Sequence, residues 1–389
     1  MSGLLPAPAR IRVLVVDDSA LMRRVLMQAL SACPDIEVVG FATNGVEALQ
    51  KVSTIKPDVV TMDVEMPDMD GLTALDGIRK SHPGVKVIMC SSLTESGARV
   101  TVDALMRGAA DYIAKPVAGV PPSESLQRLK EELGGKVRLH GTKRLAAVSA
   151  LRSPSRFAPT SRAAAPTADA AGVPAVHAPV TPLRRVAALC IGSSTGGPNA
   201  LAELFSSFRS PLAIPIFIVQ HMPPMFTRML AERLCRLNCG THFVEAEQGM
   251  QVKAGEAYIA PGGFHMEVVL KGMSSQAIRL HDGPMEHSCR PSVDVLFRSI
   301  SAVYGGTVVA TVLTGMGADG ASTSKLLGTQ GAYVIAQDEP SSVVWGMPGA
   351  VVRVGAANEV LPLNLIGPRI QELIRTGGGL VGVKKQAAA

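Results

Sequence analysis

The first part of the chain alternates short apolar runs with stretches of helical periodicity. Apolar runs rich in β-branched residues cover 11–18, 36–42, 57–63, 85–92 and 110–116. Between them, apolar residues recur at the spacings of an amphipathic helix. Continuous apolar strands that alternate with helices are typical of a parallel sheet covered on both faces. Residues 10–135 are therefore predicted to form an α/β domain with a five-stranded, doubly wound parallel sheet.

The same alternation returns later in the chain. Apolar runs at 186–197, 215–220, 306–312 and 332–338 are each followed by a helical pattern, and a last helical pattern covers 363–377. The apolar runs within 257–282 have no helical pattern between them, which predicts an antiparallel edge. Residues 186–378 are thus predicted to form a second doubly wound α/β domain. Residues 1–9 and 379–389 are predicted to be an N-terminal tail and a disordered C-terminal tail.

Residues 136–185 are predicted to be a linker between the two domains. The stretch 141–185 holds twelve alanines and six prolines and has no apolar periodicity. The prolines interrupt any longer helix, so we expect this stretch to be semi-extended. It holds seven basic residues and one acidic residue, Asp169, so its formal charge is +6. This equals the net charge of the whole chain. The rest of the chain is formally neutral and only 4% aromatic, so a nucleic-acid-binding function is not predicted.

The composition also indicates the cellular location of the protein. No apolar run approaches the roughly 20 residues that cross a bilayer, and the first residues lack the layout of a signal peptide. The six cysteines include no C-x-x-C pair, which suits reduced thiols. The sequence therefore predicts a cytoplasmic protein that is not an integral membrane protein.

Polar residues gather at the ends of the predicted strands of the first domain. They are Asp17, Asp18, Asp63, Ser91 and Lys115. The carboxyl ends of parallel strands meet at one edge of a sheet, where such folds bind their ligands. Three carboxylates repel one another unless a cation joins them, and Mg²⁺ prefers oxygen ligands. A phosphoryl-accepting Mg²⁺ site is one interpretation, and helix capping by Asp17 and Asp18 is the other.

The second domain opens with a candidate nucleophile. Residues 192–196 spell G-x-S-x-G around Ser194, between a predicted strand and a predicted helix, which is the context that this motif requires. A phosphate-binding loop is disfavoured because no Gly-Lys-Ser/Thr follows. An ordinary Gly-Ser turn is the remaining alternative.

A base and an acid can be proposed for this serine. His221 follows the run 215–220, and Asp319 follows the run 306–312, so both stand at strand ends. A serine hydroxyl needs a histidine to take its proton, and the histidine needs a carboxylate to orient it. The rival acids are Asp282, Asp294 and Asp338, and Asp319 could instead cap the helix that follows it.

The motifs of the first domain resemble those of two-component response-regulator receiver domains. The segments VVDDS, MDVEMPDMDGL, MCSS and KP occur in the order and spacing of that family. The resemblance implies that Asp63 accepts a phosphoryl group from a histidine kinase, with Mg²⁺ bound by Asp17, Asp18 and Asp63. It also implies a cis Lys115–Pro116 bond. The further switch residues that it implies are Ser91, Tyr112 and Lys115.

The second domain resembles the CheB family of chemotaxis protein-glutamate methylesterases and glutamine deamidases. IGSSTGGP, QHMPPMFT, RPSVDVLF and LTGMGADGA recur in order. The resemblance implies a catalytic triad of Ser194, His221 and Asp319, an oxyanion donor at the Met316 backbone N–H, and no cofactor for the esterase reaction. It implies methyl-accepting chemotaxis receptors as substrates, and activation by phosphorylation. The alternative is a phosphorylation-controlled scaffold without catalysis.

Overall fold

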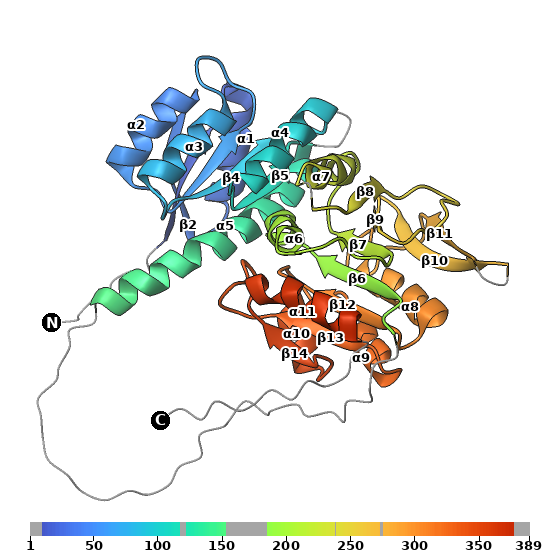
Figure 1. Ribbon diagram of the computed structural model, residues 1–389. Coiled ribbons are helices and arrows are strands. Elements are labelled where there is room, and N and C mark those ends of the chain that lie inside the picture. Colours follow the sequence, from blue (N-terminus) through green and yellow to red (C-terminus); the bar gives the residue numbers. More distant parts are fainter. Residues whose placement is uncertain (1–9, 117–121, 153–184, 238, 273–274, 377–389) are drawn as a thin grey trace, which may run out of the picture. The chain divides into compact units, whose positions relative to one another are not determined.

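The computed structural model describes residues 10–116, 122–152, 185–237, 239–272 and 275–376. The first sheet has five strands in the order β2-β1-β3-β4-β5, as the sequence predicts (Figure 1). β1 pairs in parallel with both β2 and β3. The strands are β1 (Ile11–Val16), β2 (Ile36–Ala42), β3 (Val59–Asp63), β4 (Lys86–Ser91) and β5 (Asp111–Ala114). The helices are α1 (Ala20–Ser31), α2 (Gly45–Ile55), α3 (Gly71–Ser81), α4 (Glu95–Met106) and α5 (Pro122–Arg152).

The first four helices each begin at a residue whose side chain caps the helix. Ser19, Asn44, Asp70 and Thr94 accept a hydrogen bond from the backbone N–H three residues later. Such caps satisfy N–H groups that have no partner within the helix. The cap of α1 is Ser19 rather than Asp17 or Asp18. The two aspartates are therefore not needed for that structural role.

Helix α5 extends past the predicted start of the linker. It continues from Pro122 to Arg152, so the expectation of a semi-extended chain from 141 is wrong for 141–152. Leu133 and Val137 are buried, and Arg138 donates two hydrogen bonds of 2.7 and 3.0 Å to Asp35, which precedes β2. The first helical turns beyond 135 thus pack on the N-terminal domain. Residues 153–184 lie outside the described part of the chain.

The second large sheet has seven strands in the order β14-β13-β12-β6-β7-β9-β8, and every pair of neighbours is parallel. The strands are β6 (Ala188–Ser193), β7 (Ile216–Gln220), β8 (His242–Glu245), β9 (Glu256–Ile259), β12 (Val308–Val312), β13 (Tyr333–Gln337) and β14 (Glu359–Leu361). The helices are α6 (Gly197–Ser206), α7 (Phe226–Cys235), α8 (Val293–Tyr304), α9 (Ala321–Thr329), α10 (Met347–Arg353) and α11 (Leu363–Thr376).

The antiparallel strands do not form an edge of this sheet. β10 (His265–Lys271) and β11 (Ser275–His281) pair only with each other as a two-stranded sheet among the described strands. β10 packs on α8, where the Val268 backbone N–H donates to Ser299 Oγ at 3.0 Å. Met266, Val268 and Ile278 share the apolar core with α8. The predicted antiparallel pairing is therefore present, but its apolar face is buried on a helix.

The strand order brings three strand ends together at a topological switch point. β6 lies between β7, which follows it in the chain, and β12, which comes much later (Figure 1). Ligands of doubly wound folds bind outside the carboxyl ends of the strands at such a point. Ser194 follows β6, His221 follows β7, and Asp319 lies in the loop after β12. No described helix is both long and apolar enough to cross a membrane.

One expectation concerns the geometry of a peptide bond. Among the described residues, the Arg290–Pro291 peptide bond is cis. The Lys115–Pro116 bond is not cis, contrary to the expectation from the receiver resemblance. At this position the trans form, which X–Pro bonds favour by about 0.5–1 kcal/mol, is retained.

The packing of α5 predicts how the chain responds to a charge in this helix. Val137→Asp is expected to lower the free energy of unfolding of the N-terminal domain by about 2–4 kcal/mol, because the carboxylate has no partner at a fully buried site. Glu131→Ala, on the exposed face of α5, is the control and is expected to change it by less than about 0.5 kcal/mol. Urea-dependent hydrogen exchange of β1 peptides in the full chain measures both. Equal effects of the two variants would show that the helix beyond 135 does not stabilise this domain.

Candidate active site

Ser194 lies in a tight turn between β6 and α6. Gly196 begins α6 with φ of +79°, a left-handed conformation that glycine adopts without a steric penalty. The Ser194 backbone N–H donates to the Thr314 carbonyl at 3.0 Å, which ties the turn to the loop after β12. Ser194 itself is half-buried. The motif therefore has the strand-turn-helix geometry that the sequence predicts, with the serine at the carboxyl edge of the sheet.

A buried glutamine joins the serine segment to the histidine segment. Gln220, the last residue of β7, donates from Nε2 to the Ser194 carbonyl at 2.8 Å and to the His221 carbonyl at 3.3 Å. Its Oε1 accepts from Ser193 Oγ at 2.8 Å. The His221 backbone N–H donates to the Ser193 carbonyl at 3.0 Å. Gln220 was not predicted as a site residue, although a polar residue at the end of an otherwise apolar strand run was a usable signal.

His221 and Asp319 are in direct side-chain contact. Nε2 of His221 lies 2.8 Å from Oδ2 of Asp319, and the Asp319 side chain is only 2% exposed. The rival acids are used elsewhere in the structure, since Asp294 contacts His287 and Asp338 accepts from Ser341. The structure therefore brings His221 together with Asp319, the acid that the family resemblance implies.

The N-terminus of α8 holds the Asp319 carboxylate. Oδ1 accepts from Ser292 Oγ and from the Asp294 backbone N–H, both at 2.9 Å, and Oδ2 accepts from the Val293 backbone N–H at 2.7 Å. Burial raises the pKa of Asp319, but hydrogen bonds from His221 and from the backbone of α8, with the charge of the histidine, hold the pKa below its ordinary value. A negative charge is also favoured at the positive end of a helix dipole. These donors and the helix dipole thus favour the ionised form of Asp319 behind His221.

The second ring nitrogen of His221 contacts a thiol. Sγ of Cys289 lies 3.5 Å from Nδ1 of His221. Burial lowers the pKa of His221, but the hydrogen bonds to Asp319 and Cys289 outweigh burial and raise this pKa to about 9. With Nε2 on Asp319, Nδ1 is the nitrogen that remains for a serine proton. Within the described residues Ser194 Oγ makes no hydrogen bond, so its contact with His221 stays a prediction. Catalytic hydrogen bonds are often long before substrate binds.

The loop after β12 approaches the serine from the other side. A Cβ placed at Gly315 would come within 2.8 Å of Ser194 Cβ, so the backbone passes the serine at a distance that only glycine permits. The buried Gln337 fixes this loop by accepting from the Thr314 backbone N–H at 2.8 Å. Met316 follows directly, and its side chain is 49% exposed. This arrangement leaves the Met316 segment beside Ser194.

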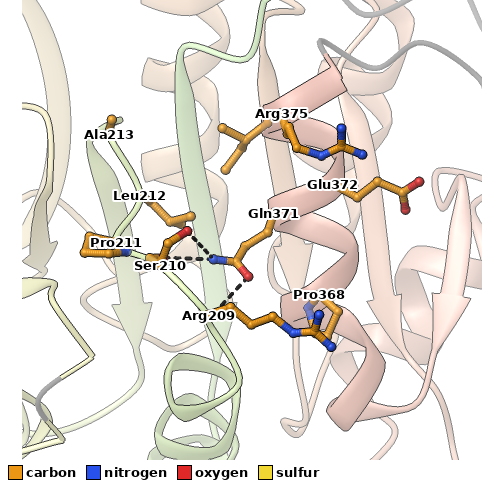
Figure 2. Close-up of a pocket in the computed structure, with 10 residues that line it drawn as sticks. Arg209, Ser210, Pro211, Leu212, Ala213, Pro368, Gln371, Glu372 and Arg375 are labelled. Carbon is orange, nitrogen blue, oxygen red and sulfur yellow. Dashed lines mark hydrogen bonds between the residues drawn. The ribbon is translucent and has the colours of Figure 1, made fainter.

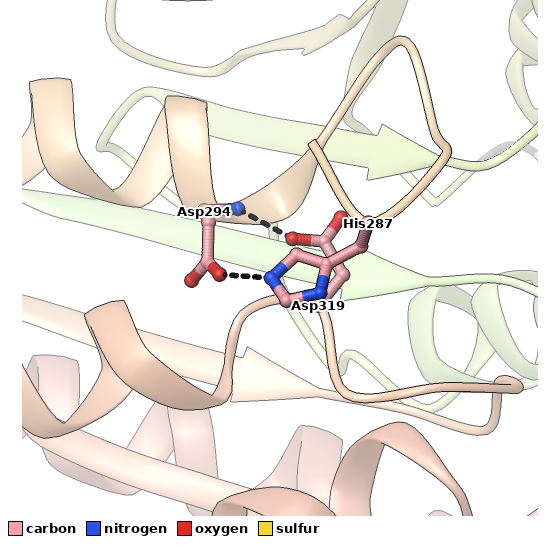
Figure 3. Close-up of side chains that lie close together, drawn as sticks. All are labelled: His287, Asp294 and Asp319. Atoms are coloured by element: carbon pink, nitrogen blue, oxygen red, sulfur yellow. Dashed lines mark hydrogen bonds and ion pairs between the residues drawn. The ribbon is translucent and has the colours of Figure 1, made fainter. Parts of the chain in front are cut away.

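His287, Asp294 and Asp319 form a cluster whose ligand atoms lie within 4.8 Å of one another (Figure 3). Its carboxylate oxygens already have donors. Asp294 Oδ2 contacts His287 Nε2 at 2.8 Å, and Oδ1 accepts from Thr323 Oγ1 at 2.5 Å. Both oxygens of Asp319 are occupied as described above. A cation would have to displace these donors, so the cluster acts as a hydrogen-bond network around Asp319 and not as a metal centre.

A separate cavity of about 520 Å³ lies between the segment before β7 and helix α11 (Figure 2). Gln371 closes one side of it, accepting from the Arg209 backbone N–H at 3.0 Å and donating to the Ser210 carbonyl at 2.8 Å. The cavity lies at the amino end of β7, whereas His221 follows the carboxyl end. It is therefore not part of the candidate active site.

The N-terminal domain holds the second candidate site. Ligand atoms of Asp17, Asp18 and Asp63 lie within 4.8 Å of one another. Asp17 and Asp63 are buried, whereas Asp18 is exposed. Three carboxylates at this spacing form the oxygen-rich donor set that suits Mg²⁺. The predicted acidic residues are thus brought together.

The other predicted residues of this domain lie on the neighbouring strands. The Lys115 backbone N–H donates to the Ser91 carbonyl at 2.7 Å, which joins the ends of β5 and β4. Ser91 is buried, and Tyr112 in β5 is partly buried. Ser91 and Lys115 lie at strand ends, as the sequence predicts, whereas Tyr112 lies within β5.

Comparison with known proteins identifies the family of each domain. The family model for the CheB methylesterase matches residues 189–370, and that for the response regulator receiver domain matches residues 13–122. A Nocardioides protein named protein-glutamate methylesterase/protein-glutamine glutaminase is 46% identical over 361 residues, covering 92% of this chain and 94% of that protein. A Trichodesmium erythraeum protein of the same name is 39% identical over 369 residues, covering 95% and 99%. This chain therefore belongs to the CheB methylesterase family, in the form that carries a response-regulator receiver domain.

Proposed function

We propose that this protein is a phosphorylation-activated serine hydrolase that removes methyl groups from glutamate γ-methyl esters of methyl-accepting chemotaxis receptors. The same reaction on an amide deamidates glutamine, and both reactions serve sensory adaptation. The observation that carries this proposal is the His221–Asp319 contact of 2.8 Å at the switch point where Ser194 also lies. The relatives named for these two activities match along nearly their whole length.

The proposed chemistry is acyl transfer through a serine ester. Ser194 Oγ attacks the ester carbonyl while Nδ1 of His221 takes its proton. Methanol leaves with that proton, and water, activated by the same nitrogen, releases the glutamate. Asp319 stabilises the imidazolium that forms in each step. The Met316 backbone N–H is proposed to bind the developing oxyanion, a role in which one donor contributes about 10²–10³ in rate. The esterase reaction is proposed to need no cofactor.

The receiver domain is proposed to control this activity. Receiver domains are phosphorylated in a Mg²⁺-dependent reaction, and we propose Asp63 as the residue that accepts the phosphoryl group from a chemotaxis histidine kinase. Asp17, Asp18 and Asp63 would hold Mg²⁺, which neutralises the charge on the transferring group. Lys115 would contact the phosphoryl oxygens, and Ser91 and Tyr112 would respond to them. The matched segments 13–122 and 189–370 lie within the proposed domains 10–135 and 186–378.

The nucleophile is tested by Ser194→Ala. Methanol release from methyl-labelled receptor membranes is expected to fall by more than about 10³-fold, because the substitution removes the hydroxyl that is proposed to form the acyl ester. Ser210→Ala, an exposed serine of the same domain, is the control and is expected to keep full activity. Release that persists in Ser194→Ala would contradict the proposed mechanism, and no release from the wild type would favour a scaffold without catalysis.

The pH dependence tests the His221–Asp319 pair. The base must be neutral, and its pKa is raised to about 9, so the rate is expected to keep rising with pH above the ordinary histidine value of about 6.5. Asp319→Asn removes the anion that favours the imidazolium. Its acid limb of kcat/KM is expected to move to lower pH, with a plateau lower by up to about 10⁴-fold. Asp282→Asn, at an exposed rival acid, serves as the control. An acid limb that is identical in wild type and Asp319→Asn would rule out this pairing.

Phosphorylation is tested by Asp63→Asn. A small phosphodonor with Mg²⁺ is expected to label the wild type with a hydroxylamine-sensitive acyl phosphate and to increase methanol release. Asp63→Asn is expected to lose both the label and the stimulation while keeping the unstimulated rate. Asp76→Asn, at an exposed position of α3, is expected to behave as the wild type. Full stimulation of Asp63→Asn would place the phosphorylated residue elsewhere.

A further inference from the structure

A tight turn presents a cysteine to the catalytic histidine. Glu286 and Cys289 exchange two backbone hydrogen bonds of 3.2 and 2.9 Å. The two residues between them, His287 and Ser288, have φ of +52° and +60°. Both central residues of the turn are therefore in the left-handed region, which is unfavourable for residues with a Cβ. Such a conformation persists only where the surroundings hold it.

Three side-chain contacts hold this turn. Arg298 of α8 donates to both carboxylate oxygens of Glu286, at 2.7 and 3.1 Å. His287 contacts Asp294 of the same helix at 2.8 Å (Figure 3). The turn is thus fixed to the helix whose N-terminus holds Asp319. Its geometry places Cys289 Sγ 3.5 Å from His221 Nδ1.

We propose that Cys289 is a positioning residue of the esterase, whose sulfur accepts a hydrogen bond from Nδ1–H of protonated His221. This inference rests on the proposed role of His221 as the base. With Asp319 on Nε2 and Cys289 at Nδ1, both ring nitrogens have a partner, so the plane of the ring is fixed. Sulfur is a weak acceptor, which allows Ser194 and the leaving group to use the same nitrogen during the reaction.

The chemistry of the surroundings agrees with this role. Within the described part of the chain, the titratable groups that are hydrogen-bonded to the His221 ring are Asp319, from the loop after β12, and Cys289, from the turn before α8. His287 and Asp294 contact each other, and the Asp294 backbone N–H reaches Asp319. Burial lowers the pKa of His221, whereas Asp319 and Cys289 both raise it. Cys289 therefore adds to the stabilisation of the imidazolium.

Removal and conservative replacement of the thiol test this proposal in the full chain. Cys289→Ala is expected to move the acid limb of kcat/KM for methanol release to lower pH. It is also expected to reduce the plateau by about 2–10-fold, the worth of one hydrogen bond. Cys289→Ser keeps an acceptor and is expected to restore much of both quantities. Cys235→Ala, at another half-buried hydrogen-bonded thiol of this domain, is the control and is expected to leave the acid limb unchanged.

The outcomes separate this proposal from the proposed function. Release that needs Ser194 but has the same acid limb in wild type and Cys289→Ala would overturn the role of Cys289 alone. A plateau lowered equally in Cys289→Ala and Cys289→Ser, with an unmoved limb, would also overturn it. Absence of release from the wild type would instead overturn the proposed function.

A volume-conserving variant covers the case in which Cys289→Ala does not fold. Cys289→Val removes the acceptor but keeps the size of the side chain. Its acid limb is expected to move to lower pH as in Cys289→Ala, and an acid limb equal to that of the wild type would overturn the proposal.

Discussion

The Asp319 carboxylate is the centre on which the catalytic arrangement depends. It accepts four hydrogen bonds, one from His221 and three from the residues that begin α8. A buried carboxylate is costly unless donors surround it, and here the first turn of a helix supplies them. The same anion thus fixes the orientation of α8 relative to the loop after β12 and the tautomer of the histidine. The placement of the base follows from satisfying one buried charge.

The parallel sheet supplies the second constraint. β12, β6 and β7 are neighbours, and each ends beside a residue of the site. Beyond the strand ends, the side chains of two glutamines make hydrogen bonds to the backbone of neighbouring segments. Gln220 joins the Ser194 and His221 segments, and Gln337 holds the Thr314 backbone. Buried polar side chains with every bond satisfied define one geometry better than apolar contacts do. The turn at the serine and the loop beside it are therefore held by amide groups rather than by packing alone.

The sequence predicted the five strands of the first sheet, the strands β6, β7, β12 and β13 of the second, and the residues that meet at the strand ends, because these features are encoded in local patterns. The short strands β8 and β14 were not predicted, and the region of β9, which is a parallel strand, was assigned to the antiparallel strands. It did not predict the length of α5. The first proline of the alanine-rich stretch is Pro154, so the helix can run to Arg152, two residues before it. The composition was assessed over 141–185 as a whole, so the end of the helix at Arg152 was not predicted. The antiparallel pairing of β10 and β11 was predicted, but their separation from the large sheet was not, because it depends on tertiary packing against α8.

Cys289 shows a further limit of the sequence. Nothing in its neighbourhood marks it, since the residues that place it beside His221 act through a turn with two left-handed residues, His287 and Ser288. Backbone conformations of this kind depend on tertiary contacts, here the hydrogen bonds from Arg298 to Glu286. The pattern of apolar and polar residues does not predict such tertiary contacts.

The same bonds that orient His221 also set its charge. A histidine whose pKa is about 9 is mostly protonated at neutral pH, and a protonated ring cannot take the serine proton. Burial acts in the opposite direction, because it disfavours the charged form. Burial and the two hydrogen bonds act on the same ring, so the charge of His221 follows from the balance between them.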